Sequence, residues 1–443
     1  MNVETNHKKI WKIAYPIILG SIAQNIIAVT DTAFLGRVGE VALGAAAIAG
    51  IFYFAIVMLG WGFGMGTQIV IARRVGEKQF DRVGKTFDHA LYFLLLLGIF
   101  LLGFMLFQAP ELLHSMVKSK AIWEASTDYL NYRAYGIVFA CCNLLFRALY
   151  IGIAQTRVIS WSTFFMAIVN ILLDYALIFG KWGLPEMGIQ GAALASVIAE
   201  ASVLVFFLLY TLKRLPVEKY KLFGFGRLDW ELYGRLFKVS FPMMLQNFLS
   251  LSCWFIFFVM VESMGEHDLA ISNIIRSIYV LLMLPVWAFA SAANTLVSQV
   301  IGEGRPHEVM GVIWRTIQLS FLSVVFLVIA SLFFPELIIS IYTEDGILIS
   351  DTLPVLYVIC GSAILFPVSI TLFHGVSGTG NTLNALILEI FVLGLYLLGV
   401  WVLTNILGAP IHWVWTAEYF YAIFLGIFSF AYLRYANWQE SQI

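Results

Sequence analysis

Apolar stretches of helix length, separated by short polar connections, follow one another along almost the whole chain. A run of about 20 apolar residues crosses a bilayer as an α-helix, whereas a membrane β-strand needs only about ten residues of alternating polarity. The pattern therefore predicts an all-α integral membrane protein with twelve transmembrane helices. The predicted spans are residues 10–35, 45–72, 88–109, 125–150, 158–180, 188–212, 231–261, 270–299, 312–334, 350–374, 383–406 and 412–434.

The two halves of the chain are related as an internal repeat. A shift of 226 residues aligns the first two spans with the seventh and eighth without a gap. Matched positions include Pro16 and Pro242, Trp61 and Trp287, and Gly76–Glu77 and Gly302–Glu303. Each half has an even number of spans, so both halves run the same way and their symmetry axis lies along the membrane normal. This layout is typical of alternating-access transporters, and it also suits a channel or a flippase.

The longest connection separates the halves. Residues 213–230 read KRLPVEKYKLFGFGRLDW, a charged stretch that contains proline and glycine and is typical of a linker. We therefore expect an N-terminal six-helix bundle over residues 1–212, a cytoplasmic linker over 213–230, and a C-terminal six-helix bundle over 231–443. Together they form two pseudo-symmetric bundles.

Composition and charge narrow the class and the orientation. The chain is 61% hydrophobic and 12% charged, with a net charge of −1, which leaves no basic face for nucleic acid. Most Lys and Arg residues fall on the side of the N-terminus and the linker, so we expect both termini in the cytoplasm. The opposite side holds few basic residues: Arg37, Lys118, Lys120, Arg133 and Lys181. No cleavable signal sequence is evident, which suits a multi-pass protein of a bacterial inner membrane.

The first span carries an acid within an apolar helix. Ser21, Gln24, Ala28 and Asp31 fall at helical spacing on one polar face. A carboxylate in hydrocarbon costs several kcal/mol unless it is protonated, paired or hydrated. Asp31 is therefore a functional candidate, and the alternative is an acid near a helix end that reaches the headgroups.

The fifth span supplies a matching pair. Asn170 and Asp174 share a face at i and i+4. Asp174 stands about 24 Å along its span, and Asp31 lies at a similar depth in the first. We predict that Asp31, Asn170 and Asp174 form a cation- or proton-coupling site, although a buried hydrogen-bond network that holds the two helices together is an alternative.

The residues alone leave the coupling ion open. Burial and a neighbouring acid favour the protonated form of a carboxyl group, so the pair can carry a proton. Carboxylate and amide oxygens also suit a hard cation, so Na⁺ is possible at Asp31, Asn170 and Asp174. We expect no other metal and no cofactor besides H⁺ or Na⁺ as the coupling ion.

The second half lacks the equivalent acid. Asn247, Ser250, Trp254 and Phe257 replace the polar face of the first span, so Phe257 stands opposite Asp31 in the repeat. We infer an ion site in the first half and aromatic cavity walls in the second. The candidate residues of a substrate cavity are Gln24, Met65, Asn247, Trp254 and Phe257. The other polar groups in spans are expected to be pairs or helix-end groups: Arg147, Glu200, Arg276, His374, Glu389 and Glu418.

Pro16, Pro242 and Pro367 lie within predicted spans. Each removes a backbone hydrogen bond and can bend its helix. Pro16 lies four turns from Asp31, so bending of the first helix is a candidate link between protonation and cavity shape.

Several stretches together resemble the multidrug and toxic compound extrusion (MATE) family. They are VTDTAFLGRVG at 29–39, VNILLDYALIFGKWGLPEMGIQGAALASVIAE at 169–200, and the paired VGE and IGE after spans two and eight. The first is most similar to the DinF-like branch. The resemblance implies two six-helix lobes around a V-shaped cavity and export of organic cations by proton or sodium antiport. It also implies an N-lobe cation site at Asp31, Asn170 and Asp174.

One departure from the branch bears on the ion. The branch has a threonine in the sixth helix at this site, where this chain has Ala192 or Ala193, with Ser196 one turn away. The missing oxygen tilts the expectation toward protons.

The function we expect is secondary multidrug efflux of mainly cationic amphipathic molecules by a monomer that is not an enzyme. The alternative is a flippase or exporter of a lipid-linked or anionic amphipathic substrate, which would line its cavity with several arginines. A membrane acyltransferase would need a His–acid set that the chain does not offer. GVSGTGNT at 375–382 lacks the lysine of a phosphate-binding loop and is expected to be a tight turn, so we expect no use of ATP.

Overall fold

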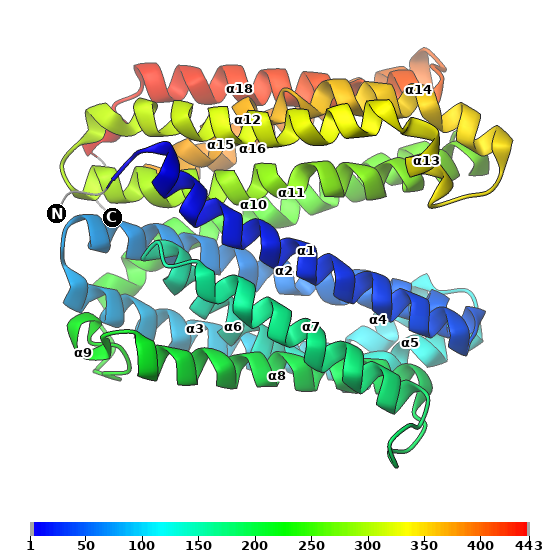
Figure 1. Ribbon diagram of the computed structural model, residues 1–443, viewed down its shortest axis with the longest axis horizontal. Coiled ribbons are helices and arrows are strands. Elements are labelled where there is room, and N and C mark those ends of the chain that lie inside the picture. Colours follow the sequence, from blue (N-terminus) through cyan, green and yellow to red (C-terminus); the bar gives the residue numbers. More distant parts are fainter. Residues whose placement is uncertain (1–3, 441–443) are drawn as a thin grey trace. The chain divides into compact units, whose positions relative to one another are not determined.

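The computed structural model describes residues 4–440, and over that range the chain is helical and contains no β-strand (Figure 1). The helices of the first half are α1 (His7–Val38), α2 (Glu40–Gly76), α3 (Phe80–Phe107), α4 (Ala109–Met116), α5 (Lys120–Arg133), α6 (Gly136–Gly152), α7 (Arg157–Ile178), α8 (Gly188–Arg214) and α9 (Val217–Tyr220). Those of the second half are α10 (Trp230–Glu262), α11 (Glu266–Gly302), α12 (Val309–Phe333), α13 (Pro335–Ser340), α14 (Gly346–Ala363), α15 (Phe366–Gly378), α16 (Thr382–Trp401), α17 (Ile411–Val414) and α18 (Ala417–Tyr435), with short helices η1 (Pro306–Glu308), η2 (Val402–Ile406) and η3 (Trp438–Glu440).

The helices confirm an all-α membrane protein. Within residues 4–440, 11 helices are long and apolar enough to cross a membrane, or 12 if the bent pair α5 and α6 is one span. That pair bends by 53°, so the predicted span 125–150 is broken. The predicted span 350–374 is likewise divided between α14 and α15, and Pro367 lies in the first turn of α15 rather than inside a helix. Proline is well tolerated there because a first-turn N–H has no partner within the helix.

The chain divides into two compact units at positions that differ from the predicted linker. The first unit covers Pro16–Met244, and the second covers the described residues up to Tyr15 together with those from Leu245 onward. The start of α1 thus belongs to the second unit and the start of α10 to the first. Both boundaries fall at or beside the repeat-related prolines, Pro16 and Pro242.

Close backbone packing explains why the start of α10 belongs to the first unit. A Cβ added to Gly62 of α2 would collide with the backbone of Met244, and one added to Gly66 would collide with Ser240. Glycine therefore lets the first part of α10 lie directly against α2. In the second unit, the Trp11 ring at the start of α1 lies 5.9 Å from that of Phe289 on α11.

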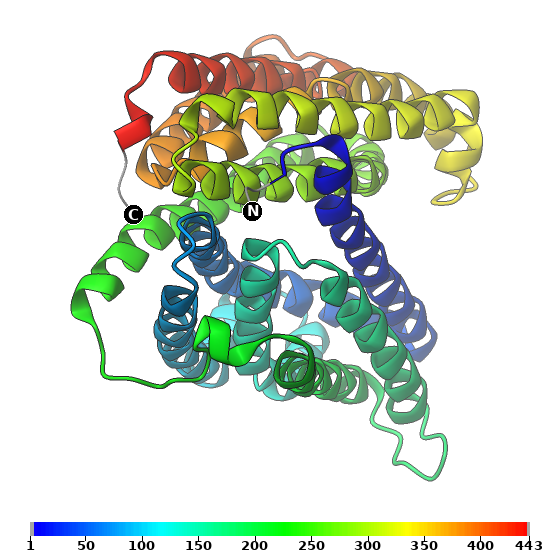
Figure 2. The same cartoon turned by 60° about the vertical axis from the view of Figure 1, so that its left-hand side comes forward.

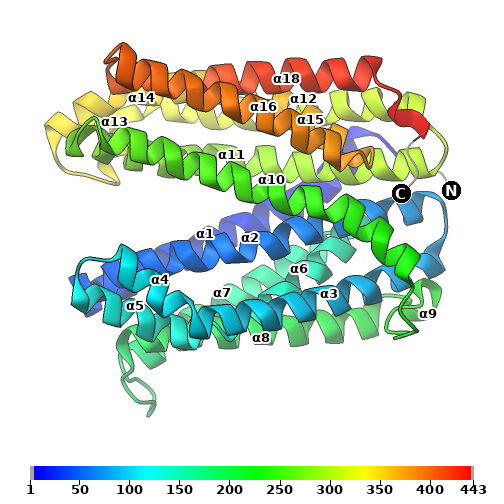
Figure 3. The ribbon, with the colours of Figure 1, turned by 180° about the vertical axis from the view of Figure 1, so that it is seen from behind.

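The two units repeat one packing scheme, which confirms the internal repeat. In the first unit α2 packs on α3 and α6, α3 on α6, and α8 on α6 and α7. In the second unit α11 packs on α12 and α15, α12 on α15, and α18 on α15 and α16. The members of each set run side by side in Figure 1 and in the reverse view of Figure 3. The predicted turn at 375–382 also holds, because α15 ends at Gly378 and α16 begins at Thr382.

Half of the linker, residues 221–229, is a loop between the short α9 and α10 (Figure 2). It is fastened to the start of α3. The Asp88 carboxylate accepts backbone hydrogen bonds from Phe223 at 3.1 Å and Phe225 at 3.0 Å. His89 Nε2 accepts the backbone N–H of Asp229 at 2.9 Å.

Candidate functional site

The candidate site of the first unit begins where α1 and α7 meet. A Cβ added to Gly20 would lie 3.3 Å from Thr163 Oγ1, so a small residue lets the helices approach. Ser160 Oγ donates to the Pro16 carbonyl oxygen at 2.8 Å. This contact fixes how α1 is aligned along α7. About three to four turns further along the two helices, Asp31 on α1 therefore faces Asn170 and Asp174 on α7.

Asn170 joins the two acids. With its amide nitrogen turned toward the carboxyl groups, Nδ2 donates to Asp31 Oδ1 at 3.1 Å and to Asp174 Oδ2 at 3.2 Å. The other end of the amide lies 3.5 Å from Ser196 Oγ on α8. Asn170 is 1% exposed and Asp174 is fully buried. The structure thus brings the three predicted residues together, with the Ser196 hydroxyl beside the Asn170 amide.

The two carboxyl groups lie beside the same amide, that of Asn170. Two buried acids so close to one donor repel each other when both are ionised, so the loss of one proton is easier than the loss of both. Asp174 Oδ1 is buried without a partner among residues 4–440. Such an arrangement suits an acid pair that takes up and releases a proton.

An ion pair that sequence reasoning missed lies beside this acid pair. The Arg133 guanidinium binds Glu200 through two hydrogen bonds, at 2.6 and 2.9 Å. Its Cζ also lies 3.8 Å from the centre of the Tyr53 ring. Asn143 donates to the Glu200 carbonyl oxygen at 2.9 Å.

Arg133 is more than a basic residue of the side opposite the N-terminus, because its side chain lies inside the first unit. Its side chain is only 11% exposed and its charge acts on Asp31. A signal was present in the sequence, because Arg133 lies eight residues inside the predicted span 125–150. Glu200 was expected to pair within the bundle, and it does.

A cavity of about 320 Å³ joins these groups within the first unit. Its wall includes Gln24, Asp31, Asn170 and the Arg133–Glu200 pair, together with apolar side chains of α2, α6, α7 and α8. Gln24 is thus on the cavity wall, as predicted, and Met65 is not part of that wall.

Arg147 on α6 also lines this cavity. Its guanidinium carbon lies 5.5 Å from the centre of the Trp61 ring. Arg147 was expected to be an intrabundle pair or a helix-end group. Instead, no carboxylate of residues 4–440 pairs with it.

The remaining cavity candidates lie in the second unit. Asn247 is half-buried on α10, and Trp254 packs its ring 5.3 Å from that of Tyr279. Phe257 is 1% exposed and packs against Trp415 at 4.9 Å and Tyr396 at 6.1 Å. Its position is therefore in the hydrophobic core of the second unit rather than on an accessible wall, because its neighbours enclose the whole ring.

The second unit buries two acids of its own. Glu389 is 3% exposed and accepts hydrogen bonds from Ser250 at 2.9 Å and Tyr421 at 3.0 Å. Glu418 is 2% exposed and accepts from Tyr396 at 3.0 Å. Within residues 4–440 neither acid forms an ion pair, so tyrosine and serine hydroxyls take the place of the arginine found in the first unit.

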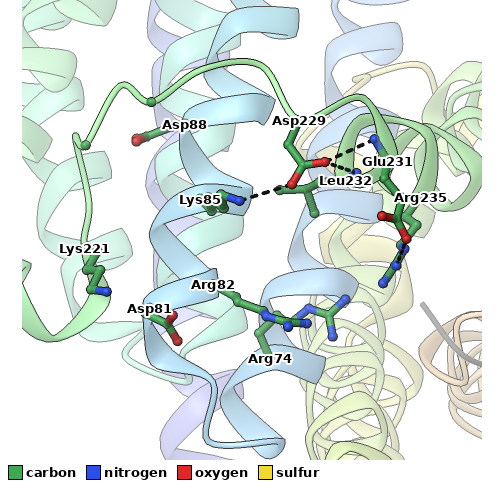
Figure 4. Close-up of a pocket in the computed structure, with 12 residues that line it drawn as sticks. Arg74, Asp81, Arg82, Lys85, Asp88, Lys221, Asp229, Glu231, Leu232 and Arg235 are labelled. Atoms are coloured by element: carbon green, nitrogen blue, oxygen red, sulfur yellow. Dashed lines mark hydrogen bonds and ion pairs between the residues drawn. The ribbon is translucent and has the colours of Figure 1, made fainter.

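A second cavity, of about 420 Å³, lies between α3, the linker and the start of α10 (Figure 4). It mixes basic and acidic side chains: Arg74, Arg82, Lys85, Lys221, Arg235, Asp81, Asp88, Asp229 and Glu231. Lys85 Nζ lies 3.1 Å from Asp229 Oδ2, and Arg235 pairs with Glu231. The backbone N–H of Leu232 and the Lys85 ammonium lower the pKa of Asp229. We interpret this cavity as part of the contact surface that holds the linker against α3.

The family model described as MatE matches residues 16–176 and again residues 242–402. The protein named "Probable multidrug resistance protein NorM" of Synechocystis sp. is 28% identical over 346 residues, which cover 77% of this chain and 74% of that protein. The protein of the same name from Thermotoga maritima is 26% identical over 388 residues, which cover 86% of this chain and 82% of that protein.

Solved structures show the same fold. "Outward-facing conformation of a multidrug resistance MATE family transporter of the MOP superfamily" matches with a TM-score of 0.90, and "Crystal structure of MATE in the straight conformation" with 0.89. Each is 20% identical in sequence, and each match covers 97% of this chain and 95% of the other. The two matched segments of the family model coincide with the two halves of the repeat.

Proposed function

Because this chain belongs to the MatE family, we propose that it is a multidrug efflux transporter. It would exchange protons for amphipathic organic cations by alternating access. Its curated relatives from Synechocystis sp. and Thermotoga maritima carry the name of multidrug resistance proteins. We place it as a monomer in the cell inner membrane, with both termini in the cytoplasm. The DinF-like branch stays a prediction.

The observation that carries this proposal is the contact of Asp31 with Asn170 and Asp174 in the first unit. When the acid pair loses its proton, the cavity gains negative charge and attracts an organic cation. When the pair regains the proton, that attraction falls and the cation leaves. Proton and substrate then compete for one site, which is sufficient for antiport when the two ligands prefer different conformations.

The residues around Asn170 support protons over sodium, because Ala192 and Ala193 offer no side-chain oxygen to a bound cation. With its amide nitrogen toward the carboxyl groups, Asn170 donates a hydrogen bond to each of them. A sodium site would require the amide to turn and present its carbonyl oxygen. The same residues would then form the sodium shell together with Ser196.

The test is efflux of a fluorescent organic cation from drug-sensitive cells that express the wild type or Asp31→Asn. Efflux in sodium-free buffer that is abolished by a protonophore and by the substitution supports proton exchange at Asp31. A requirement for sodium would move the same residues into a sodium site. Absence of cation efflux by a well-expressed wild type would contradict the proposal.

Pro16 is proposed as the bending point of α1. Proline removes the backbone hydrogen bond to residue 12, so α1 can bend at this position while Ser160 holds the Pro16 carbonyl. Pro16→Ala should reduce transport more than proton binding, which is measured on the purified protein. Transport equal to that of the wild type would rule out this role.

The flippase alternative receives less support. It calls for several uncompensated arginines along a cavity, and the wall described here contains Arg133 and Arg147. Glu200 neutralises Arg133 at 2.6 Å, which leaves Arg147. A single positive charge fits one acidic group of a small molecule better than a lipid-linked pyrophosphate.

A further inference from the structure

The cavity between α3, the linker and the start of α10 contains basic groups that its acids do not pair. Two of the acids are already engaged in ion pairs with Lys85 and Arg235. A third acid, Asp88, accepts backbone hydrogen bonds from the linker. Arg82 and Lys221 line the same cavity, and within residues 4–440 neither of them forms an ion pair. Their positive charges are therefore available to a ligand.

Arg74 brings a third positive charge to this cavity from the last turn of α2. Its side chain is only 6% exposed and pairs with Glu77 at 2.7 Å, which holds it in place. Figure 4 shows the guanidinium groups of Arg74 and Arg82 in the same part of the cavity, although they come from different helices. A phosphate group can accept hydrogen bonds from several such groups at once, and arginine–phosphate contacts are among the strong ones.

The cavity lies where two membrane-crossing helices end. The helices α2 and α3 are both long and apolar enough to span a membrane, and they are joined at Gly76–Phe80. The apolar spans predicted within them are residues 45–72 and 88–109, so Arg74 and Arg82 stand about 3 and 9 Å beyond the hydrocarbon along their helices. The headgroup layer is about 5–8 Å thick on each side of a bilayer, within reach of arginine side chains. Figures 1 and 3 show α9 at this same end of the first unit.

The linker beside the cavity exposes large apolar side chains. Phe225 is 56% exposed, Leu228 is 50% exposed and Trp230 is 75% exposed. Aromatic and aliphatic side chains next to Lys and Arg are typical of segments that lie in the membrane interface. A free phosphate ion would leave these side chains uncovered, whereas the acyl chains of a lipid bound through its headgroup would lie beside them.

We infer that this cavity binds the phosphate of an anionic phospholipid headgroup through Arg74, Arg82 and Lys221. Its volume of about 420 Å³ is that of a small-ligand pocket and accommodates a phosphate together with glycerol groups. Asp81 lines the same cavity and offsets part of the positive charge, so a singly charged phosphodiester fits better than a dianion. The inference goes beyond the proposed export function, because the acid pair and the cavity that contains it take no part in this site.

The test is a titration of the purified full chain with short-chain phosphatidylglycerol in detergent, with bound lipid counted by native mass spectrometry. Arg82→Gln and Lys221→Asn should each weaken binding about fivefold, because each removes one positive charge near the headgroup. Asparagine is chosen at position 221 because it tolerates the left-handed backbone of Lys221, where φ is 49°. Asp81→Asn should strengthen binding, because it removes the opposing charge.

Matched controls separate the site from general attraction between charges. Arg227→Gln removes an exposed arginine of the linker that lies outside the cavity wall, so binding should stay as in the wild type. Arg82→Gln breaks no ion pair among residues 4–440 and should melt near the wild type. Inorganic phosphate serves as the competitor that lacks acyl chains, and it should displace the lipid only weakly.

Equal weakening by Arg82→Gln and Arg227→Gln would reduce the binding to diffuse surface charge and overturn the site. Inorganic phosphate that binds as tightly as the lipid would overturn the lipid as the occupant. A wild type that exports an organic cation but binds no phosphatidylglycerol would overturn this inference and leave the export function standing. A wild type that binds the lipid as described but exports no cation would overturn the export function alone.

Discussion

The two units of this protein share a helix packing scheme and differ in the polar groups that they bury. The first unit holds an acid pair bridged by an amide, with an arginine–glutamate pair beside it. The second unit holds two glutamates that accept hydrogen bonds from hydroxyl groups. Where the first unit has Asp31, the repeat gives the second unit Phe257, which packs into the core against Trp415. The two copies of one scaffold thus carry different chemistry, because they differ in a few side chains at equivalent positions.

The largest difference in stability between the two units should appear when the Arg133–Glu200 ion pair of the first unit is broken. Arg133→Gln leaves Glu200 as a largely buried carboxylate without its counter-charge, so the free energy of unfolding should fall by about 3–5 kcal/mol. The measurement is thermal or denaturant unfolding of the purified protein. Replacing Arg133 and Glu200 together by methionine should recover most of the loss, and equal losses in the single and double variants would show that the charge pair is not the cause.

The next largest loss of stability should come from disturbing the close packing of α10 on α2. Gly62→Ala places a methyl group against the backbone of Met244, and overpacking of this kind costs about 1–3 kcal/mol. The repeat gives the second unit Ala288 at the matching position, so that unit already accepts the methyl group. Gly103→Ala is the matched control, because nothing lies within 4 Å of a Cβ added there. Equal melting of both variants would contradict the close approach of α10 to α2.

The sequence predicts much of this organisation because membrane helices and repeats leave local signals. The acid pair follows from helical spacing and equal depth, and the structure brings Asp31, Asn170 and Asp174 together as expected. The Arg133–Glu200 contact joins residues 67 apart in sequence, and spacing along one helix does not reveal contacts between helices. The break between α5 and α6 has no proline to announce it, whereas Pro367 marks the matching break before α15.

Composition also does not predict the positions at which the chain divides into its two units. A charged linker at 213–230 suggested a boundary there, yet the units part at Pro16 and just beyond Pro242. The reason is tertiary packing, since Gly62 and Gly66 accept the backbone of α10. A run of glycines in an apolar helix signals close approach but does not identify the partner.

A smaller effect is expected from the acids of the second unit. Glu389→Gln keeps a carbonyl oxygen for Ser250 and Tyr421 and removes no counter-charge, so the free energy of unfolding should change by less than about 1.5 kcal/mol. Substrate-driven proton exchange should persist. A loss of stability as large as that of Arg133→Gln would show that the second unit, too, depends on an ionised carboxylate.

The smallest effect belongs to the exposed linker. The pKa of Asp229 is lowered in the folded protein by the Leu232 N–H and by Lys85, so its contribution is present above the ordinary aspartate pKa of about 3.9 and is lost as the pH falls through the lowered value. Pepsin cleavage of the linker should therefore accelerate at the acidic end of that range. Asp229→Asn should cleave quickly throughout, and a pH response identical to the wild type would exclude Asp229 as its source.

The central claim is that the acid pair of the first unit carries the exchanged proton. The most direct measurement is proton release from the purified protein in weakly buffered solution when an organic cation binds, compared between wild type, Asp31→Asn and Glu389→Gln. Release that occurs in the wild type and in Glu389→Gln and is absent in Asp31→Asn is the expected result. Release that survives in Asp31→Asn and disappears in Glu389→Gln would place the proton in the second unit and contradict the account.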